Sequence, residues 1–388
     1  MDQLFIGFTS LTWQSIVMML IGGVLIWLAV KKEYEPMLLL PIGFGAILVN
    51  LPLATVWEHA GSSGFLKVLF EGGIQNELFP ILIFIAVGAM CDFRPMFKNP
   101  VMMFFGVAAQ FGIFATLIAV VALGTAFPGL IATGDNSLLE VASAIGIIGA
   151  ADGPTSIFVA TRFAKQYLGP ISVAAYSYMA LVPLIQPPVI KALTTKSERM
   201  IKMVAHETSI PKSLTVSFPI IVTVVAGLVA PMSVPLIGSL MFGNLIRESG
   251  VLERLSAAAQ NELANIVTLL LGITIGGSMN AKDFLNPTTI MILAMGLVAF
   301  VFDTAGGVLF AKFLNLFRKE KINPMVGAAG ISAFPMSARV IQKMATAEDP
   351  NTFIIMQAVG ANVSGQLGSV MAGGIVLALV PVLLGVLK

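Results

Sequence analysis

Long, uninterrupted apolar runs constrain this chain more than any other feature of its sequence. Clear examples cover residues 11–30, 37–56, 100–127, 170–193, 214–230 and 287–311. About 20 helical residues cross the roughly 30 Å hydrocarbon core of a bilayer, whereas barrel strands alternate over about ten residues. Only 11% of the residues are charged, against about a quarter in soluble chains. The runs therefore predict an all-α polytopic membrane protein.

An acid stands at a helix break inside this apolar chain. The apolar run 141–151 ends at Asp152, which is followed by Gly153, Pro154 and the hydroxyls of Thr155 and Ser156. Glycine and proline both interrupt helices, and an ionisable group at membrane depth is costly unless it has a function. Helix capping is the alternative for Asp152, and for the hydroxyls the two roles are compatible. The pattern favours an ion site between two half-helices.

The two halves of the chain repeat the same landmarks. Segments 88–100 and 277–287 both carry a Gly-x-Met triplet, then Asn-Pro at the start of a long apolar run. Likewise, Gly149-Ala-Ala precedes Arg162, and Gly327-Ala-Ala precedes Arg339, with breakers and hydroxyls between. Such a duplication predicts inverted repeats that meet near the bilayer midplane. We divide the chain into N-terminal scaffold spans (1–76), a first repeat (77–193, hairpin 141–164), a cytoplasmic loop with connecting spans (194–260) and a second, inverted repeat (261–388, hairpin 323–343).

The basic residues predict an orientation. We place the N-terminus outside and let 141–164 enter and leave the membrane from the outer side. All 22 Lys and Arg residues then fall on the cytoplasmic side except Lys67, Arg162, Lys165, Lys282 and Lys388, which is the expected positive-inside bias. A full crossing by 141–164 would put the basic loop 191–212 outside. We therefore expect two re-entrant hairpins, one from each side, buried or lining a polar cavity.

Four motifs carry a resemblance to a known family. They are GAADGPTSIFVATRFA (149–164), SYMALVPLIQPPV (177–189), NPMVGAAGISAFPMSARV (323–340) and GANVSGQLGS (360–369). In this order they resemble the β subunits of the sodium-pumping biotin-dependent decarboxylases, which act on oxaloacetate, methylmalonyl-CoA, glutaconyl-CoA or malonate. The resemblance covers nearly the whole chain.

The resemblance implies a coupled machine. A carboxyltransferase subunit moves CO₂ onto biotin held by a carrier, and the β subunit decarboxylates carboxybiotin with an outer-side proton and exports Na⁺. The implied fold is an elevator-like transporter with a scaffold and a mobile core, assembled as a homotrimer. A small membrane γ or δ subunit completes the complex, in the cytoplasmic (inner) membrane of a bacterium. No basic patch with interleaved aromatics suggests nucleic acid.

The resemblance also implies roles for individual residues. The implied Na⁺ ligands are Asp152, Thr155, Ser156, Asn323, Ser332 and Asn362. Decarboxylation and proton delivery would involve Asp152, Tyr178 and Arg339, and Arg339 with Ser332 would hold carboxybiotin. The plainer alternatives are helix–helix glue for the asparagines, packing for Tyr178 and a positive-inside anchor for Arg339.

Three points stay open at this stage. Asp303, deep in a span, could be an ion ligand, a proton relay or the partner of a basic residue. Gly327 permits either close approach at the site or simple helix packing. A Na⁺-coupled secondary transporter of a carboxylate is the alternative function, but such a carrier has no need of Arg339 together with Asn323 and Ser332 in this spacing.

Overall fold

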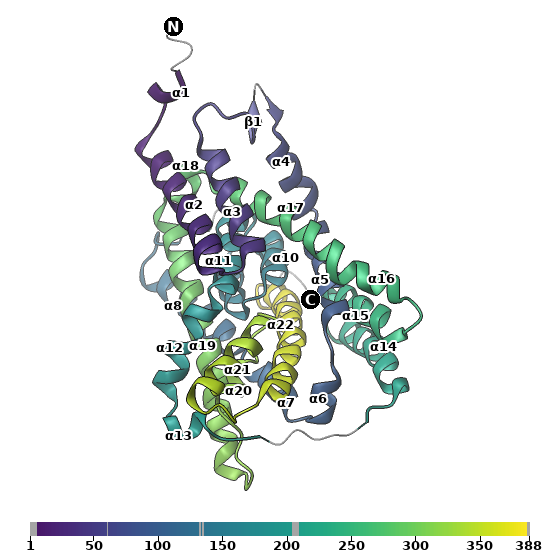
Figure 1. Cartoon of the computed structure of the whole chain (residues 1–388). Helices are drawn as coiled ribbons and strands as arrows, with labels where there is room; N and C mark the ends of the chain where they lie inside the picture. The colour runs from purple at the N-terminus through teal and green to yellow at the C-terminus, as the bar shows by residue number, and fades with distance from the viewer. Residues whose placement is uncertain (1–5, 60, 132, 134–135, 204–208, 386–388) are drawn as a thin grey trace.

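The protein is built almost entirely of helices in the computed structural model, which describes residues 6–59, 61–131, 133, 136–203 and 209–385 (Figure 1). Six helices are long and apolar enough to cross a membrane, and two bent helix pairs bring the number to eight within these ranges. The strands in the described part of the chain are the two-residue β1 (Glu58–His59) and β2 (Ser62–Ser63), which pair antiparallel. The predicted all-α membrane architecture is confirmed.

Six helices form what we call the first helix group. They are α2 (Trp13–Lys32), α3 (Pro36–Asn50), α5 (Leu78–Met90), α14 (Lys212–Val229), α15 (Val234–Ser249) and α17 (Ala264–Gly277). Helix α3 packs on α2 and α17, and α15 packs on α14 and α5. The contacts between α3 and α17 and between α5 and α15 both depend on glycine. A side chain on Gly276 would meet the carbonyl oxygen of Ile42, and a side chain on Gly243 would meet that of Ile85.

Two buried asparagines stabilise the turns that follow α17 and α5. Asn50, the last residue of α3, donates from Nδ2 to the carbonyl of Met279 (2.7 Å) and accepts from the N–H of Ala281 (2.9 Å). Asn244 on α15 donates to the carbonyl of Cys91 (2.9 Å). Each amide thus binds backbone groups that the end of a helix leaves without helical partners.

Eleven further elements pack on one another and form the second helix group, which lies beside the first (Figure 1). Its members are α7 (Met102–Ala108), α8 (Phe111–Ala126), α9 (Leu138–Gly146), η3 (Ile147–Ala150), α10 (Gly153–Phe163), α11 (Leu168–Ala180), α12 (Val182–Leu193), α19 (Pro287–Phe317), α20 (Met325–Ala328), α21 (Met336–Glu348) and α22 (Ile355–Leu383). Helix α22 packs along α7, and α8 lies between α19 and α9. Helix α10 reaches across to α5 of the first group.

Short elements connect these helices. They are α1 (Ile6–Thr9), α4 (Phe65–Leu69), η2 (Phe70–Gln75), α6 (Arg94–Lys98), η4 (Lys165–Tyr167), α13 (Lys196–Arg199), η5 (Pro231–Ser233), α16 (Glu253–Ala258), η6 (Ala259–Leu263) and α18 (Ala281–Phe284). Segments η2 and η6 are both π-helical and precede α5 and α17 respectively. Residues 204–208 of the expected cytoplasmic loop lie outside the described residues.

Two of the predicted spans are not continuous α-helices. The span predicted over 170–193 bends by 68° between α11 and α12, where Pro183 lacks the N–H that a continuous helix needs. The other bent pair joins Phe65–Gln75 to Leu78–Met90 at 60°. The span predicted over 100–127 still counts as one span, Met102–Ala126, but its helical hydrogen bonding is interrupted at Ala109 and Gln110. There the Gln110 side chain donates to the carbonyl of Gly106 (2.8 Å), the acceptor that its own backbone N–H would use in a continuous helix.

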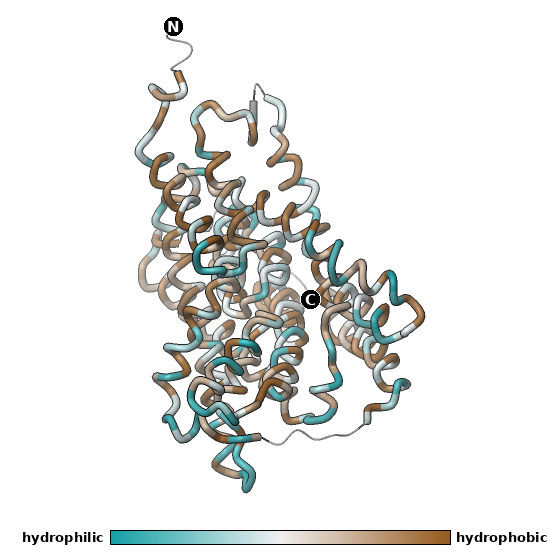
Figure 2. Tube along the Cα trace, viewed as in Figure 1, coloured by the Kyte–Doolittle hydropathy of each residue, from teal (hydrophilic) through white to brown (hydrophobic). Residues whose placement is uncertain are grey.

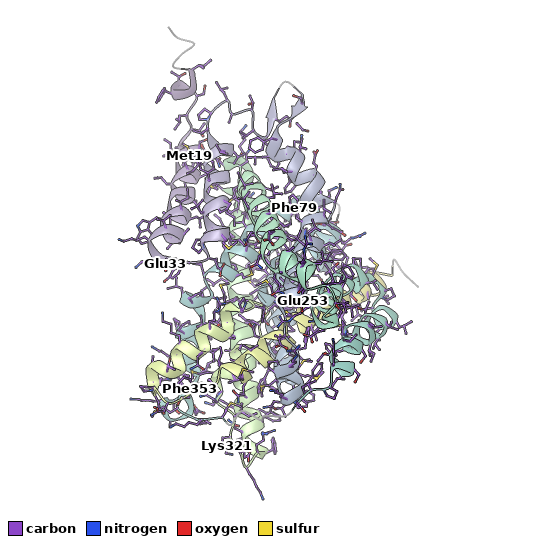
Figure 3. All side chains as sticks on the ribbon, turned by 45° about the vertical axis from the view of Figure 1, so that its right-hand side comes forward. Met19, Glu33, Phe79, Glu253, Lys321 and Phe353 are labelled. Carbon is purple, nitrogen blue, oxygen red and sulfur yellow. The ribbon has the colours of Figure 1, made fainter. Side chains whose placement is uncertain are left out.

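Hydrophobic residues follow the helices, and hydrophilic residues gather mainly in the connecting segments (Figure 2). Only 17% of the spans in α2 and in α14 is buried within the protein. Large apolar side chains such as Trp13, Trp27 and Leu228 are exposed there. In water such surfaces would be costly, so these two helices face lipid or another membrane protein. Lys321 and Phe353 lie at the end of the molecule opposite Met19 (Figure 3).

Candidate functional site

The break predicted around Asp152 is present and buried. The chain leaves η3, passes Ala151 in a left-handed conformation (φ +51°), and starts α10 with Asp152 as its N-cap. The backbone of Gly153 packs against the ring of Tyr176, and any side chain at this position would collide with that ring. The residue types at this turn therefore place an acid at the start of a half-helix, where the helix dipole favours negative charge.

Hydroxyl groups surround the Asp152 carboxylate, which is only 4% exposed. Its Oδ2 accepts from Thr155 Oγ1 (2.8 Å) and from Ser369 Oγ on α22 (2.6 Å). Its Oδ1 accepts from the backbone N–H of Thr155 (3.3 Å). Ser156 Oγ donates to the backbone carbonyl of Asp152 (2.8 Å). This is a set of hard oxygens of the kind that alkali and alkaline-earth cations prefer.

A second break lies in 329–335, between α20 and α21, and touches the first. The N–H of Ser332 donates to the carbonyl of Ala150 (3.0 Å), and Ser332 Oγ donates to the carbonyl of Gly365 on α22 (2.9 Å). Asn362 Nδ2 donates to the carbonyl of Ile331 (2.7 Å). The buried Oδ1 of Asn362 has no hydrogen-bond partner among the described residues. The segments carrying Asp152, Ser332 and Asn362 are thus brought together, with one carbonyl oxygen left available.

One cavity of about 320 Å³ joins Asp152 to Arg339. Its polar walls come from both sides. Asn265 and Thr268 lie on α17 of the first group, and Glu35 and Gln260 lie in segments next to that group. The second group and its connections supply Asp152, Tyr176, Ser332, Arg339 and Gln366. Methionine and aromatic side chains supply much of the remaining wall. The volume falls within the range of small-molecule sites, and so does the mixture of apolar walls with a few polar groups.

Arg339 and Glu35 both line this cavity. Arg339 is exposed and makes no ion pair with any residue in the described ranges. Glu35 lies between α2 and α3, outside both helices. Its burial raises the pKa of its carboxyl above the usual value, and the nearby Arg339 charge only partly offsets that rise. A planar guanidinium without a carboxylate partner suits an incoming carboxylate.

Two predicted site residues lie elsewhere. Asn323 is buried, but its Nδ2 donates to the carbonyls of Arg199 (2.9 Å) and Ile201 (3.0 Å), and its Oδ1 accepts from the N–H of Met325. Tyr178 donates its hydroxyl to the carbonyl of Leu293 on α19. Neither residue lines the cavity. In this conformation Asn323 stabilises the loop after α13, and Tyr178 links α11 to α19.

Sequence reasoning overlooked three residues at the site. Tyr176 lines the cavity beside Asp152, and its buried hydroxyl has no partner among the described residues. Gln366 lines the cavity and donates to the carbonyl of Ser332, and Ser369 binds Asp152. Asn362, Gln366 and Ser369 follow an i, i+4, i+7 spacing, which places them on one helix face. This spacing was visible in the sequence, whereas nothing there distinguished Tyr176 from Tyr178.

Asp303 occupies a separate buried position on α19. Its Oδ1 accepts from the N–H of Gly112, in the first turn of α8. Its Oδ2 has no hydrogen-bond partner among the described residues, and it faces Gly149 of η3. No basic side chain forms an ion pair with Asp303 in the described part of the chain. Of the three roles left open, the ion pair with a basic residue is therefore absent among the described residues. Asp303 instead caps the start of α8.

Ion pairs hold the loop around α13 against the second helix group. Arg199 pairs with Glu348 of α21 (2.7 Å), Lys312 of α19 pairs with Glu198 (3.1 Å), and Lys202 pairs with Asp349 (3.4 Å). Partial burial acts to raise the pKa of Glu198. Hydrogen bonds from Thr195 and Lys312 outweigh that effect and hold this pKa below its usual value. Glu198 therefore stays charged at neutral pH, and Asn323 rests on a firmly held loop.

Comparison with known proteins gives consistent matches. A family model described as the Na⁺-transporting oxaloacetate decarboxylase beta subunit matches residues 14–380. The methylmalonyl-CoA decarboxylase subunit beta of Propionigenium modestum is 46% identical over 394 residues, covering 96% of each chain. The glutaconyl-CoA decarboxylase subunit beta of Acidaminococcus fermentans is 48% identical over 374 residues, covering 96% of this chain and 95% of that one. The oxaloacetate decarboxylase beta chain of Klebsiella pneumoniae is 42% identical over 413 residues, covering 93% and 94%. The resemblance predicted from four motifs is confirmed.

Proposed function

This chain belongs to the family of Na⁺-transporting decarboxylase β subunits, and from that membership we propose that it decarboxylates carboxybiotin and couples the reaction to Na⁺ export. The observation that carries the proposal is the single cavity that joins the hydroxyl-lined Asp152 carboxylate to the unpaired guanidinium of Arg339. One end offers ligands for a hard cation and the other a partner for a carboxylate. Both are needed if decarboxylation is to drive ion movement.

The Na⁺ substrate would bind at Asp152. Thr155, Ser156, Ser332 and Asn362 supply the other oxygens proposed from the sequence, and Ser369 joins them because it contacts the same carboxylate oxygen. The unpartnered Oδ1 of Asn362 supports the proposal, because an orphaned buried carbonyl is costly without a ligand. Asn323 remains a proposed ligand of lower rank, since its amide is already bonded to the loop around α13.

The carboxybiotin substrate would enter from the cytoplasm on a partner's carrier domain. Arg339 would bind its carboxylate, and Ser332 lies further along the same cavity wall. Decarboxylation breaks the N–C bond, releases CO₂ and leaves the ureido nitrogen to take up one proton. We propose that this proton comes from the outer side by way of Asp152. The family resemblance implied that Tyr178 delivers it, and Tyr176 is the tyrosine beside Asp152 in this conformation.

We further propose an elevator built from two inverted repeats with two re-entrant hairpins (141–164 and 323–343). The first helix group would be the scaffold and the second the mobile core. The equivalent pairs α3–α17 and α5–α15, the π-helical segments before α5 and α17, and the matched roles of Asn50 and Asn244 support this proposal. In this scheme α14 and α15 are the counterparts of α2 and α3, so each repeat starts earlier than residues 77 and 261.

Partners complete the proposal. A carboxyltransferase subunit, a biotin carrier and a small γ or δ membrane subunit would supply the carboxylated biotin and hold the complex together. The exposed apolar faces of α2 and α14 are available to the lipid bilayer and to further copies of the chain in a homotrimer. We place the complex in the cytoplasmic (inner) membrane of a bacterium.

The direct test uses the purified protein in sealed vesicles with free carboxybiotin or a carboxylated carrier. We expect Na⁺-dependent decarboxylation accompanied by Na⁺ movement, and a loss of about 100-fold or more on Asp152→Asn, in line with the usual effect of removing a positioned acid–base group. The matched control is Asp349→Asn, which removes the same charge from a cytoplasmic turn. Decarboxylation that ignores Na⁺ would contradict the proposal. Carboxylate uptake without decarboxylation would favour the secondary transporter.

A further inference from the structure

An ion pair connects the two helix groups on the side that the charge distribution assigns to the outside. Arg162, near the end of α10, approaches Glu77 with 3.2 Å between Nε and Oε1. Glu77 is the N-cap of α5 and holds a left-handed conformation (φ +62°). It is only 9% exposed, so the surrounding protein has displaced most of its hydration. A desolvated acid of this kind needs its cationic partner.

The same two residue types, a glutamate that caps a first-group helix and an arginine of the second group, occur together a second time, at the cavity. Arg339 follows Gly327-Ala-Ala as Arg162 follows Gly149-Ala-Ala. The acid on the other side is Glu35, the N-cap of α3, which is also left-handed (φ +35°). Both acids therefore precede helices of the first group, and both arginines stand on broken segments of the second group.

The two pairs differ in one respect. Glu77 and Arg162 are in contact, whereas Glu35 and Arg339 stand on the walls of the open cavity and form no ion pair among the described residues. Their charges still influence each other across this space. The structure thus combines a closed pair at the end of α10 remote from Asp152 with an open pair in the cavity that Asp152 lines.

We propose that Glu77–Arg162 and Glu35–Arg339 are alternating gates, so that the outer pair closes when the ion site faces the cytoplasm and the inner pair closes when it faces outward. This inference rests on the proposed elevator function. The core carries both arginines, and its movement past the scaffold would exchange one contact for the other. These are positioning residues, since Glu77, Arg162 and Glu35 need not touch the reacting atoms.

The inner gate adds a rule for coupling. Arg339 can pair with Glu35 or bind the carboxylate of carboxybiotin, but its planar donor group cannot serve both fully. While the carboxylate occupies Arg339, the inner gate stays open. It closes only after CO₂ has left, so the ion site turns outward after the reaction and not before it.

The first experiment measures Na⁺ transported per CO₂ released. It uses the complete decarboxylase complex in sealed proteoliposomes, with Arg162→Gln and Glu77→Gln in this chain. We expect both variants to keep Na⁺-dependent decarboxylation in detergent within about twofold, while the Na⁺/CO₂ ratio in vesicles falls at least fivefold because the outer side leaks. The double variant Glu77→Arg with Arg162→Glu should restore most of the ratio. An unchanged ratio in both single variants would overturn the proposal.

Lys67→Gln is the matched control. It breaks an ion pair of nearly the same length, Lys67 with Glu58 (3.1 Å), which lies within one short segment and does not connect the two groups. We expect a wild-type Na⁺/CO₂ ratio for this variant. A loss equal to that of Arg162→Gln would mean that any broken ion pair loosens the protein, and the gate assignment would be wrong.

A second measurement holds even if the charge variants fold poorly. The chain has a single cysteine, Cys91, which is buried, so Glu77→Cys with Arg162→Cys can be joined selectively by a cleavable bismaleimide. We expect the cross-link to stop steady-state Na⁺ transport and decarboxylation while carboxylated-carrier binding persists, and reductive cleavage to restore turnover. Transport that continues in the cross-linked protein would refute an opening of this contact.

Glu35→Gln tests the inner gate. Without its acid, Arg339 should bind the carboxylated carrier more tightly, with KM lowered about threefold, and the Na⁺/CO₂ ratio should fall. An unchanged KM and ratio would overturn the inner half of the proposal. Failure of the proposed function is distinguishable from all these outcomes, because wild-type complex would then show no Na⁺-dependent decarboxylation.

Discussion

Asp152 combines two roles that are often treated as alternatives. It caps α10 through the backbone N–H of Thr155, and its second oxygen gathers two hydroxyls into a polar site. Asparagine caps helices about as well as aspartate does, so Asp152→Asn keeps the cap and removes the charge. The variant therefore probes ion binding without deleting the turn. Sequence reasoning identified both roles, because an acid before Gly-Pro in an apolar chain satisfies the requirements of each.

Ser369 should contribute to Na⁺ affinity through Asp152. Its hydroxyl lies 2.6 Å from Asp152 Oδ2, and we expect it to be a cation ligand in the loaded state. Hydrogen bonds to charged groups are worth about 1.5–3 kcal/mol, so Ser369→Ala should raise the Na⁺ concentration for half-maximal decarboxylation about tenfold. The control is Ser364→Ala. Ser364 lies on α22 like Ser369, but its hydroxyl donates to the carbonyl of Met103 on α7, so this variant should leave the half-maximal Na⁺ concentration unchanged. Equal effects would point to a general loosening of α22.

Arg339 should be sensitive to geometry as well as to charge. Lysine keeps the positive charge but presents it as a point, without the planar fork that matches a carboxylate. We expect Arg339→Lys to raise the KM for carboxylated carrier about tenfold and leave Na⁺ affinity nearly unchanged. Lys343→Gln, one turn further along α21, should affect neither. Equal loss of carrier use and Na⁺ affinity would argue instead that α21 had been disrupted.

At the scale of elements, proline alone does not tell where a membrane helix breaks. Pro41, Pro219 and Pro381 lie inside α3, α14 and α22, which continue through them, as membrane helices often do. Pro183, in contrast, starts a new helix after a 68° bend. The break at Asp152 was predictable because glycine, proline and an acid coincide there. The break at Gln110 was not, because it depends on where one amide side chain points.

The contact between α19 and α20 should tolerate no side chain. A methyl group on Gly327 would collide with the carbonyl of Gly307, so backbone of the second broken segment lies directly on α19. We expect Gly327→Ala to lower thermal stability in detergent by several degrees and to reduce decarboxylation, because overpacking typically costs about 1–3 kcal/mol. Gly23→Ala on α2, where a methyl group meets nothing within 4 Å, should be neutral. A neutral Gly327→Ala would show that α19 and α20 can separate freely.

At the scale of the whole molecule, the repeated landmarks predicted a duplicated chain but not how its parts pack. Helix α3 lies on α17, more than 200 residues away in sequence, and Asn50 fastens the two. Such pairings depend on matched glycine surfaces that one sequence does not reveal. The same applies to Tyr176 and Tyr178, two residues apart on α11. The rotation of α11 about its own axis, which is set by packing against the neighbouring helices, decides which of the two tyrosines lines the cavity.

The proposed orientation can be measured by cysteine labelling in intact cells. Cys91 is buried and should stay silent. A cysteine introduced at Pro128, between α8 and α9, should react with a membrane-impermeant maleimide from outside, and one at Lys319, after α19, should react only after permeabilisation. The opposite labelling pattern would mean that the cavity opens to the outside and that the outer and inner gates are exchanged. Labelling of both positions from outside would contradict a membrane span between them.

The hydrogen bond from Ser332 to Ala150 has a consequence for efficiency. It joins the segment that would hold the ion to the segment that leads to Arg339, so in the proposed elevator the Na⁺ site and the carboxylate site would move together. Movement of one site relative to the other would then not uncouple decarboxylation from Na⁺ transport. The distance between the cation site and the carboxylate site would then stay fixed, and departure of the carboxylate would change the electric field at the cation before the core moves. Such a pump would lose its Na⁺/CO₂ stoichiometry by leakage around the moving core, because the two sites would not shift relative to each other within it.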